Sequence, residues 1–172
     1  MNTTLLIGGC RSGKSSHALH LADRMEKSEK FFIATCIPRD DEMHQRVYKH
    51  QAERGADWTA VETPVFLPAA IRDIGPKADV LVVDCLTLWV SNLMLEYTDP
   101  DAISEKTAQL IESLRVAVCP VILVTNEVGA GIVPDNQLAR QFRDAVGQVN
   151  QRIAACADQV IWMVAGIPVK IK

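Results

Sequence analysis

The strongest chemical signal in the sequence is the segment at residues 8–15, which reads GGCRSGKS. It satisfies the spacing G-x-x-x-x-G-K-[ST] of a phosphate-binding loop and stands between an apolar run and an amphipathic helical pattern. In such a loop glycines let backbone N–H groups approach phosphate, Lys14 reaches the terminal phosphates and Ser15 ligates magnesium. We therefore expect a purine nucleoside triphosphate with Mg²⁺ here. The Arg11 side chain could contact phosphate or remain in solvent, and the sequence leaves both alternatives open.

A carboxylate follows another apolar run, VLVV at residues 80–83. Asp84 ends this run, where an acidic residue would stand beside the loop and hold magnesium, usually through water. An aspartate at the end of a strand is commonly only a cap. Together with the phosphate loop, however, Asp84 is better interpreted as the magnesium carboxylate.

The segment at residues 125–128 reads TNEV and follows a further apolar run. It superficially resembles the guanine-reading N-K-x-D element of regulatory GTPases. It lacks both the lysine and the aspartate of that element, so we reject a guanine-reading role.

A histidine on a predicted helix could act as a nucleophile. The acidic run DDE predicts the start of a helix over residues 40–54. His50 lies seven residues after Met43 and three after Val47 on this helix. We therefore expect His50 to share the inward face of this helix. Arg46 and Arg54, one turn to either side, would attract phosphate and keep the imidazole neutral, as attack on phosphorus requires. Spacing alone nevertheless favours a packing role over a nucleophilic one.

The candidate site residues must be positioned by strands and helices. Along the sequence, short apolar runs alternate with longer helical patterns. This rhythm predicts an α/β fold with a mainly parallel sheet, and runs that are apolar throughout predict helices on both faces. We expect a RecA-like P-loop fold with a short C-terminal antiparallel strand. The expected strands are residues 3–7, 31–34, 80–83, 121–125, 160–164 and 169–171. The expected helices are residues 14–26, 40–54, 86–95, 101–118 and 134–157, and a connecting region is marked by Pro64, Pro68, Gly75 and Pro76.

Composition and charge bound the possible functions. The 172 residues are 48% hydrophobic and 23% charged, which is typical of one folded domain, here residues 1–172. A net charge of −3 provides no broad basic field for nucleic acid or an anionic membrane, so we expect a small-molecule partner. Five widely spread cysteines indicate reduced thiols and a cytoplasmic protein. We expect no membrane span, because no apolar run approaches ~18 residues, and no signal peptide.

Further motifs follow the phosphate loop in a familiar order. They are IAT at 33–35, DEM at 41–43, His50, TNEVG at 125–129, GIVP at 131–134, LAR at 138–140, VNQR at 149–152 and GIPVKIK at 166–172. With these motifs the chain resembles, over nearly its whole length, the bifunctional adenosylcobinamide kinase/adenosylcobinamide-phosphate guanylyltransferases of cobalamin biosynthesis. Two positions depart from the family pattern: Cys10 stands where alanine is commoner, and Asp84 where some members place glutamate. Either carboxylate can orient magnesium.

The resemblance implies two reactions and the residues that perform them. Adenosylcobinamide is phosphorylated on its aminopropanol hydroxyl, and GMP then passes from GTP to adenosylcobinamide phosphate through a guanylylated histidine, matched here by His50, with release of pyrophosphate. The implied nucleotides are GTP and ATP, the implied metal is Mg²⁺ on Ser15 and Asp84, Lys14 is catalytic with His50, and the implied assembly is a homo-oligomer, a trimer. The implied nucleotide contacts are Gly8, Gly9, Cys10, Arg11, Ser12, Gly13, Lys14, Ser15, Thr35, Cys36, Ile37, Gln51, Ala52, Glu53, Arg54, Glu62 and Asp84.

Two other functions would also use a phosphate loop. In a plain small-molecule kinase His50 would only pack, whereas a switch or assembly module of RecA type would use hydrolysis to change conformation. Such modules usually present extended basic or partner-binding surfaces, which this slightly acidic chain does not. The general base of the kinase step could be Asp84, Asp41 or Glu127, and the sequence does not decide among them. It also does not decide whether that step prefers ATP or GTP.

Overall fold

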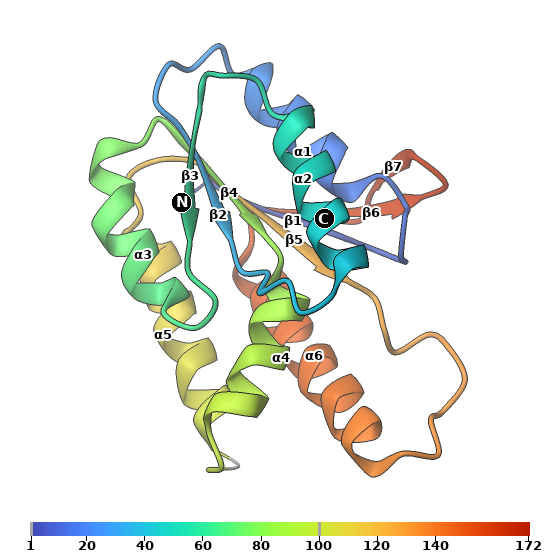
Figure 1. The fold of residues 1–172 in the computed structure, drawn as a ribbon. Coiled ribbons are helices and arrows are strands. Elements are labelled where there is room, and N and C mark those ends of the chain that lie inside the picture. The colour runs from blue at the N-terminus through green and yellow to red at the C-terminus, as the bar shows by residue number, and fades with distance from the viewer. Residues whose placement is uncertain (1, 100) are drawn as a thin grey trace.

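A computed structural model of the chain describes residues 2–99 and 101–172, and within the helix Asp41–Glu53 the side chains of Arg46, His50 and Glu53 lie outside the described part. The strands of the described residues form one sheet in the order β3-β2-β4-β5-β1-β6-β7 (Figure 1). All pairs are parallel except β6 with β7. The strands are β1 (Thr3–Gly8), β2 (Lys30–Ala34), β3 (Trp58–Glu62), β4 (Val80–Asp84), β5 (Val121–Asn126), β6 (Gln159–Val164) and β7 (Ile167–Lys170). The expected parallel sheet with a short antiparallel C-terminal strand is confirmed.

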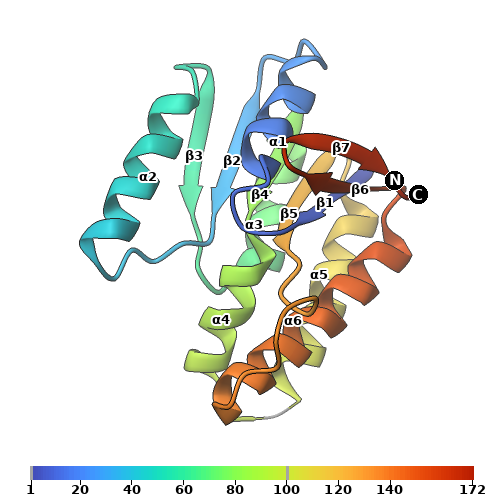
Figure 2. The ribbon, with the colours of Figure 1, turned by 90° about the vertical axis from the view of Figure 1, so that its right-hand side faces the viewer.

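Helices cover both faces of this sheet, as expected. They are α1 (Lys14–Asp23), α2 (Asp41–Glu53), α3 (Leu67–Ile74), α4 (Leu86–Glu96), α5 (Ala102–Val116) and α6 (Gln137–Cys156), with a 3₁₀ turn η1 (Gly75–Lys77). Helix α1 packs over β4, β5 and β1 on one face, while α3, α4, α5 and α6 supply the core of the other. Helix α2 lies beside β3 at one end of the sheet, and β7 lies at the opposite end (Figure 2).

Alternation along the central strands supplies two apolar layers. Leu5 and Leu123 belong to the layer beneath α3, α4, α5 and α6, whereas the next residues, Leu6 and Val124, belong to the layer beneath α1. Successive side chains of a strand point to opposite faces, so a run that is apolar throughout fits a strand buried on both sides. The carboxyl ends of the parallel strands therefore meet at one edge of a rigid, doubly covered sheet.

Two elements were missed by the sequence prediction. Strand β3 is an edge strand, and its residues are half-buried or exposed, so it shows no apolar run. Helix α3 starts within the expected connecting region and carries Pro68 in its first turn, where the missing N–H of proline breaks no helical hydrogen bond. Strand β7 begins at Ile167, two residues earlier than expected.

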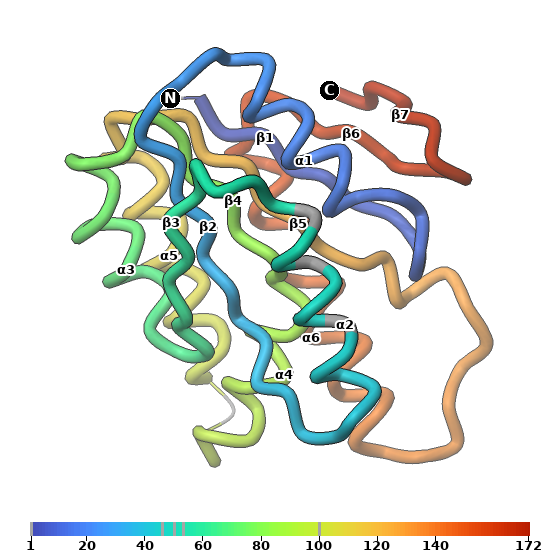
Figure 3. The backbone as a smooth tube through the Cα atoms, turned by 45° about the horizontal axis from the view of Figure 1, so that its top comes forward, coloured from blue at the N-terminus to red at the C-terminus, as the bar shows by residue number. Residues whose placement is uncertain are grey.

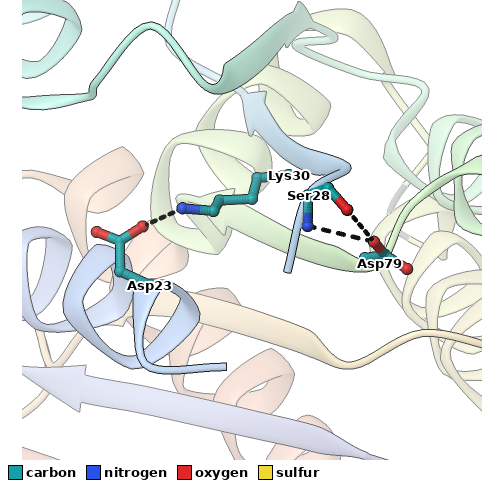
Figure 4. Close-up of polar contacts among 4 residues, drawn as sticks. All are labelled: Asp23, Ser28, Lys30 and Asp79. Carbon is teal, nitrogen blue, oxygen red and sulfur yellow. Dashed lines mark hydrogen bonds and ion pairs between the residues drawn. The ribbon is translucent and has the colours of Figure 1, made fainter. Parts of the chain in front are cut away.

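The amino-terminal edge of the sheet is held by polar contacts (Figure 4). Asp79 accepts hydrogen bonds from the N–H of Ser28 at 3.3 Å and of Glu29 at 3.2 Å, and these backbone donors, Glu29 foremost, lower the pKa of its carboxyl. The Nζ of Lys30 lies 2.7 Å from Oδ1 of Asp23. These contacts join β2 to α1 and to the start of β4, at the edge opposite the phosphate loop.

Candidate nucleotide-binding site

The loop between β1 and α1 has the backbone of a phosphate cradle. Gly13 has φ 88° and Arg11 has φ 55°, left-handed conformations that glycine adopts freely and arginine rarely. A Cβ on Gly8 would clash with the backbone carbonyl oxygen of Met163 on β6 and lie 2.8 Å from Oγ of Ser12, so the close approach of the loop to β6 requires glycine there. The N–H of Gly166 donates to the carbonyl of Ser12 at 3.1 Å, so the β6–β7 turn supports the loop from outside.

Helix α1 begins directly after this loop. Gly13 occupies its N-cap position without a side-chain cap, and its first turn contains no acidic residue. The N–H groups of a first helical turn have no partner inside the helix, and the helix dipole adds positive potential there. This described helix end is therefore suited to an anion such as phosphate.

Lys14 is held against the loop. Its Nζ donates to the carbonyl of Gly9 at 2.6 Å and lies 3.4 Å from Oγ of Ser12. The residue is buried, and this burial lowers the pKa of its ammonium group, while the charge of Asp84 opposes the shift. The lysine is thus a partly desolvated cation close to the predicted magnesium carboxylate.

Two carboxylates lie at the carboxyl ends of β3 and β4, the strands on either side of β2. Ala34 on β2 is in register with Asp84 on β4 and with Glu62 on β3, so the three side chains share one face. Phe32, two residues before Ala34, belongs to the layer under α1, which identifies that face as the one carrying the phosphate loop. The structure therefore brings Asp84 and Glu62 to the same face and the same edge as the loop.

Arg54, directly after α2, is a second cation affected by these carboxylates. Its guanidinium carbon lies 3.9 Å from the centre of the Phe32 ring, a cation–π contact. Burial lowers the pKa of this guanidinium, and the charges of Asp84 and Glu62 oppose the shift. The negative charge of Asp84 thus stabilises two cations, Lys14 and Arg54.

Thr35 supports the end of β4 from inside the protein. Its side chain is fully buried, and its hydroxyl donates to the carbonyl of Cys85 at 2.7 Å and accepts from the Cys85 N–H at 2.8 Å. Asn92 donates to the Thr35 carbonyl at 2.8 Å. Burial raises the pKa of the Cys85 thiol to about 12, so it remains a neutral thiol. The Thr35 side chain thus holds the residue that follows Asp84, and the expected nucleotide contact at Thr35 stays a prediction.

Helix α2 carries His50, whose side chain lies outside the described residues. The helix is capped by Asp40, whose carboxylate accepts from the N–H of Met43 at 2.8 Å. The expectation of an inward face shared with buried residues is only partly met: Met43 and Val47 are half-buried, and no described residue of α2 is buried. Tyr48 is 75% exposed, so the described part of this helix makes little contact with the core.

The remaining predicted contacts lie around this edge with differing exposure. Cys10 and Arg11 are exposed, Ser15 and Cys36 are half-buried, and Ile37 is 39% exposed. Gln51 and Ala52 are exposed on α2 and Glu53 has no described side chain. These placements leave Cys10, Arg11 and Ile37 accessible to a ligand.

The donor set fits magnesium bound together with phosphate. Magnesium prefers oxygen ligands and is usually held by one or two carboxylates plus substrate phosphates. Ser15 lies in the first turn of α1 and Asp84 ends β4 on the same face, which supplies a hydroxyl and a carboxylate. Among the described side chains no group of three His, Cys, Asp or Glu could hold a metal ion.

Two residues that frame the site, Asn92 and Asn150, were not predicted as site residues from the sequence. Asn92 is the one asparagine in the apolar helix α4, and Asn150 lies on the buried stripe of α6. A polar residue on an apolar face was the available signal, because buried amides require hydrogen-bond partners. Of the three candidate bases, Asp84 ends β4, and Glu127 follows β5 and donates its N–H to the Gly8 carbonyl at 3.0 Å. Asp41 is exposed on α2.

The fold and the loop define a P-loop nucleotide-binding protein. Among solved structures, the chain is similar to the flagellar accessory protein FlaH from Methanocaldococcus jannaschii, with a TM-score of 0.56, 14% identity and coverage of 99% of this chain and 78% of that chain. The RadB recombinase gives a TM-score of 0.56 at 14% identity, covering 94% and 73%. Identities this low support the fold alone.

The family follows from closer relatives. The model of the family described as cobinamide kinase / cobinamide phosphate guanyltransferase matches residues 4–171. The bifunctional adenosylcobalamin biosynthesis protein CobU of Escherichia coli (strain K12) is 42% identical over 98% of both chains, and CobP of Pseudomonas aeruginosa (strain PAO1) is 39% identical over 98% of this chain and 96% of that protein. The chain belongs to the cobinamide kinase / cobinamide phosphate guanyltransferase family and is a bifunctional kinase and guanylyltransferase. No helix within the described ranges is long and apolar enough to cross a lipid bilayer.

Proposed function

We propose that one phosphate cradle, built by residues 8–15, serves both reactions: phosphorylation of adenosylcobinamide, and transfer of GMP from GTP to adenosylcobinamide phosphate through guanylylated His50. The observation that carries this proposal is the loop with its buried Lys14, in a chain that matches the family model over residues 4–171. The described residues offer no second P-loop motif. The products are adenosylcobinamide-GDP and pyrophosphate.

The kinase half uses the loop to hold the transferred phosphoryl group. When a nucleotide enters, a phosphate oxygen is a stronger acceptor for the Lys14 ammonium than the Gly9 carbonyl it now contacts. Ser15 and Asp84 would hold Mg²⁺, which neutralises charge on the phosphates when bound. Thr35 keeps Asp84 in place through Cys85, as its two hydrogen bonds to that backbone indicate.

The transferase half needs a neutral imidazole. A ring nitrogen of His50 attacks the α-phosphorus of GTP, a P–N bond forms, and the bond to pyrophosphate breaks. A phosphate oxygen of adenosylcobinamide phosphate then attacks the same phosphorus, and the P–N bond breaks to regenerate the histidine. Arg54, one turn beyond His50 on the chain, would help to keep the imidazole uncharged.

Labelling with GTP tests the histidine directly. We expect GTP labelled at the α-phosphate to leave label on the protein that is labile to acid and stable to base, and His50→Ala to abolish it. His44→Ala, an exposed histidine on the same helix, is the matched control and should keep the label. His50→Ala should still phosphorylate adenosylcobinamide, because the loop is unchanged.

Two results would overturn the proposal. Wild-type protein that takes up no label would remove the covalent step, and equal loss of both reactions in His50→Ala would contradict the division of labour. Corrinoid-independent hydrolysis of GTP to GDP, without pyrophosphate, would favour a nucleotide switch instead.

We also propose that the enzyme works as a cytoplasmic homo-oligomer, a trimer, through the β6–β7 sheet edge. Trp162 and Val169 are in register across β6 and β7 and are 46% and 45% exposed, and Val164 and Ile167 continue the same face at 43% and 64%. Adjacent exposed apolar residues of this kind are typical of contact surfaces. A second copy of the chain is the proposed partner.

A further inference from the structure

A closed chain of buried hydrogen bonds holds the last residue of β5. Oγ1 of Thr125 donates to Oδ1 of Asn150 at 2.7 Å, and the Thr87 hydroxyl lies 3.3 Å from Oγ1 of Thr125. The Thr87 oxygen also accepts from the N–H of Asn126 at 2.7 Å, and Nδ2 of Asn150 donates to the Asn126 carbonyl at 3.1 Å. Thr87, Thr125 and Asn150 are all buried. Both backbone polar groups of Asn126 are thus fixed by side chains from α4 and α6.

The side chain of Asn126 belongs to the face that carries the phosphate loop. Val124 lies in the apolar layer beneath α1, and alternation puts Asn126, two residues later, on the same face. Asn126 is in register with Gly8, the first residue of the loop, and Val124 is in register with Asp84. Because β5 lies between β1 and β4, Asn126 stands between loop and carboxylate, about 7 Å farther along the strand than Asp84. Figure 3 shows the chain leaving β5 close to the β1–α1 loop.

The carboxamide of Asn126 is available to a ligand. The residue is half-buried, and its side chain makes no hydrogen bond to any residue that the structure describes. A buried hydroxyl or amide is costly unless it is hydrogen-bonded, and here the three side chains bond to one another and to the N–H and the carbonyl of Asn126. The network therefore fixes the position of a free amide donor beside the phosphate cradle.

We propose that the Asn126 carboxamide donates a hydrogen bond to a γ-phosphoryl oxygen of the triphosphate in this cradle, and so distinguishes triphosphate from diphosphate. The inference rests on the proposed function. An amide adds a directed donor without a further charge near Lys14 and Arg54, as suits an oxygen on which charge is spread during phosphoryl transfer. Asn126 is thereby a catalytic residue of the kinase step, and Thr87, Thr125 and Asn150 are positioning residues.

Binding measurements with two nucleotides test this role. Asn126→Ala leaves the network intact, because the network contacts only the backbone of Asn126. With Mg²⁺ present, isothermal titration should show affinity for the β,γ-imido analogue of GTP falling about 10-fold or more, and affinity for GDP changing less than about 2-fold, since one hydrogen bond to a charged acceptor is lost. Asn136→Ala, an exposed cap of α6, is the control and should change neither. Equal effects on both nucleotides, or no effect, would overturn the inference.

A double-mutant cycle tests the positioning residues. In the parent, Thr87→Val should lower the preference for the triphosphate analogue over GDP. In the Asn126→Ala background, the same substitution should change this preference almost not at all. Thr107→Val removes another buried hydroxyl, one that donates to the Ile103 carbonyl at 2.6 Å on α5, and should leave the preference unchanged. An equal effect of Thr87→Val in both backgrounds would refute its action through Asn126. Failure of the parent to phosphorylate adenosylcobinamide would instead refute the proposed function and leave this binding result standing.

Discussion

At the scale of single residues, Lys14 lowers the stability of the folded protein. Its ammonium is buried against the loop, and burial lowers its pKa below the ordinary value of 10.5. A cation with a lowered pKa is less stable in the folded state than in the unfolded chain, so it opposes folding. Functional sites commonly retain such costs because binding requires them.

Replacing this lysine should therefore stabilise the protein while removing nucleotide binding. We expect Lys14→Met to raise the free energy of unfolding by about 1 kcal/mol near neutral pH. In the parent the unfolded chain binds more protons than the folded protein between the lowered pKa and 10.5, so stability rises with pH across that window. The gain should thus shrink as the pH approaches 10.5. Urea unfolding at several pH values measures this, and a destabilised variant at pH 7 would contradict it.

At the scale of elements, the turn from β4 into α4 depends on a contact from a neighbouring strand. The hydroxyl of Thr35, at the end of β2, bridges the N–H and the carbonyl of Cys85. The side chain of Cys85 in turn caps α4 by accepting from the N–H of Leu88 at 3.5 Å. One buried hydroxyl therefore links two strands and a helix directly behind Asp84.

Removal of this hydroxyl should cost stability. We expect Thr35→Val to lower the free energy of unfolding by about 2 kcal/mol, because the buried N–H of Cys85 loses its acceptor. Thr59→Val changes an exposed residue on β3 in the same way and should have an effect near zero. Urea denaturation compares the two variants, and equal stability would show that the bridge does not support the turn.

The sequence predicted most of this architecture for identifiable reasons. Strands β1, β4 and β5 are buried on both faces and so appear as apolar runs, and the loop at residues 8–15 has a spacing that fixes its backbone. Strand β3 is largely exposed and left no such run. The network around Asn126 was not predictable because its members are far apart in sequence, and only the fold brings α4, β5 and α6 together.

At the scale of the whole molecule, the edge of the sheet formed by β6 and β7 presents apolar side chains. Strand β7 ends the sheet, and Trp162 and Val169 share a face there with substantial exposure. This surface lies on the β6–β7 unit whose turn supports the phosphate loop through Gly166 and Ser12. Assembly through this edge would therefore also steady the loop.

A charge on this surface should disrupt assembly. We expect sedimentation of the parent as an oligomer, and of Trp162→Glu as a monomer, because a buried unpaired carboxylate is strongly disfavoured. Leu95→Glu alters another exposed apolar residue, 58% exposed on α4, and should leave the assembly intact. A parent that sediments as a monomer would contradict the proposed surface.

The most direct test of a single shared cradle is to measure both half-reactions on one preparation of Lys14→Ala. Loss of a preorganised group that stabilises developing charge typically lowers turnover about 10²- to 10³-fold. We therefore expect phosphorylation of adenosylcobinamide and formation of adenosylcobinamide-GDP from its phosphate to fall together by at least about 100-fold. If either reaction proceeds at the parent rate, the two reactions use different nucleotide sites and no single cradle serves both.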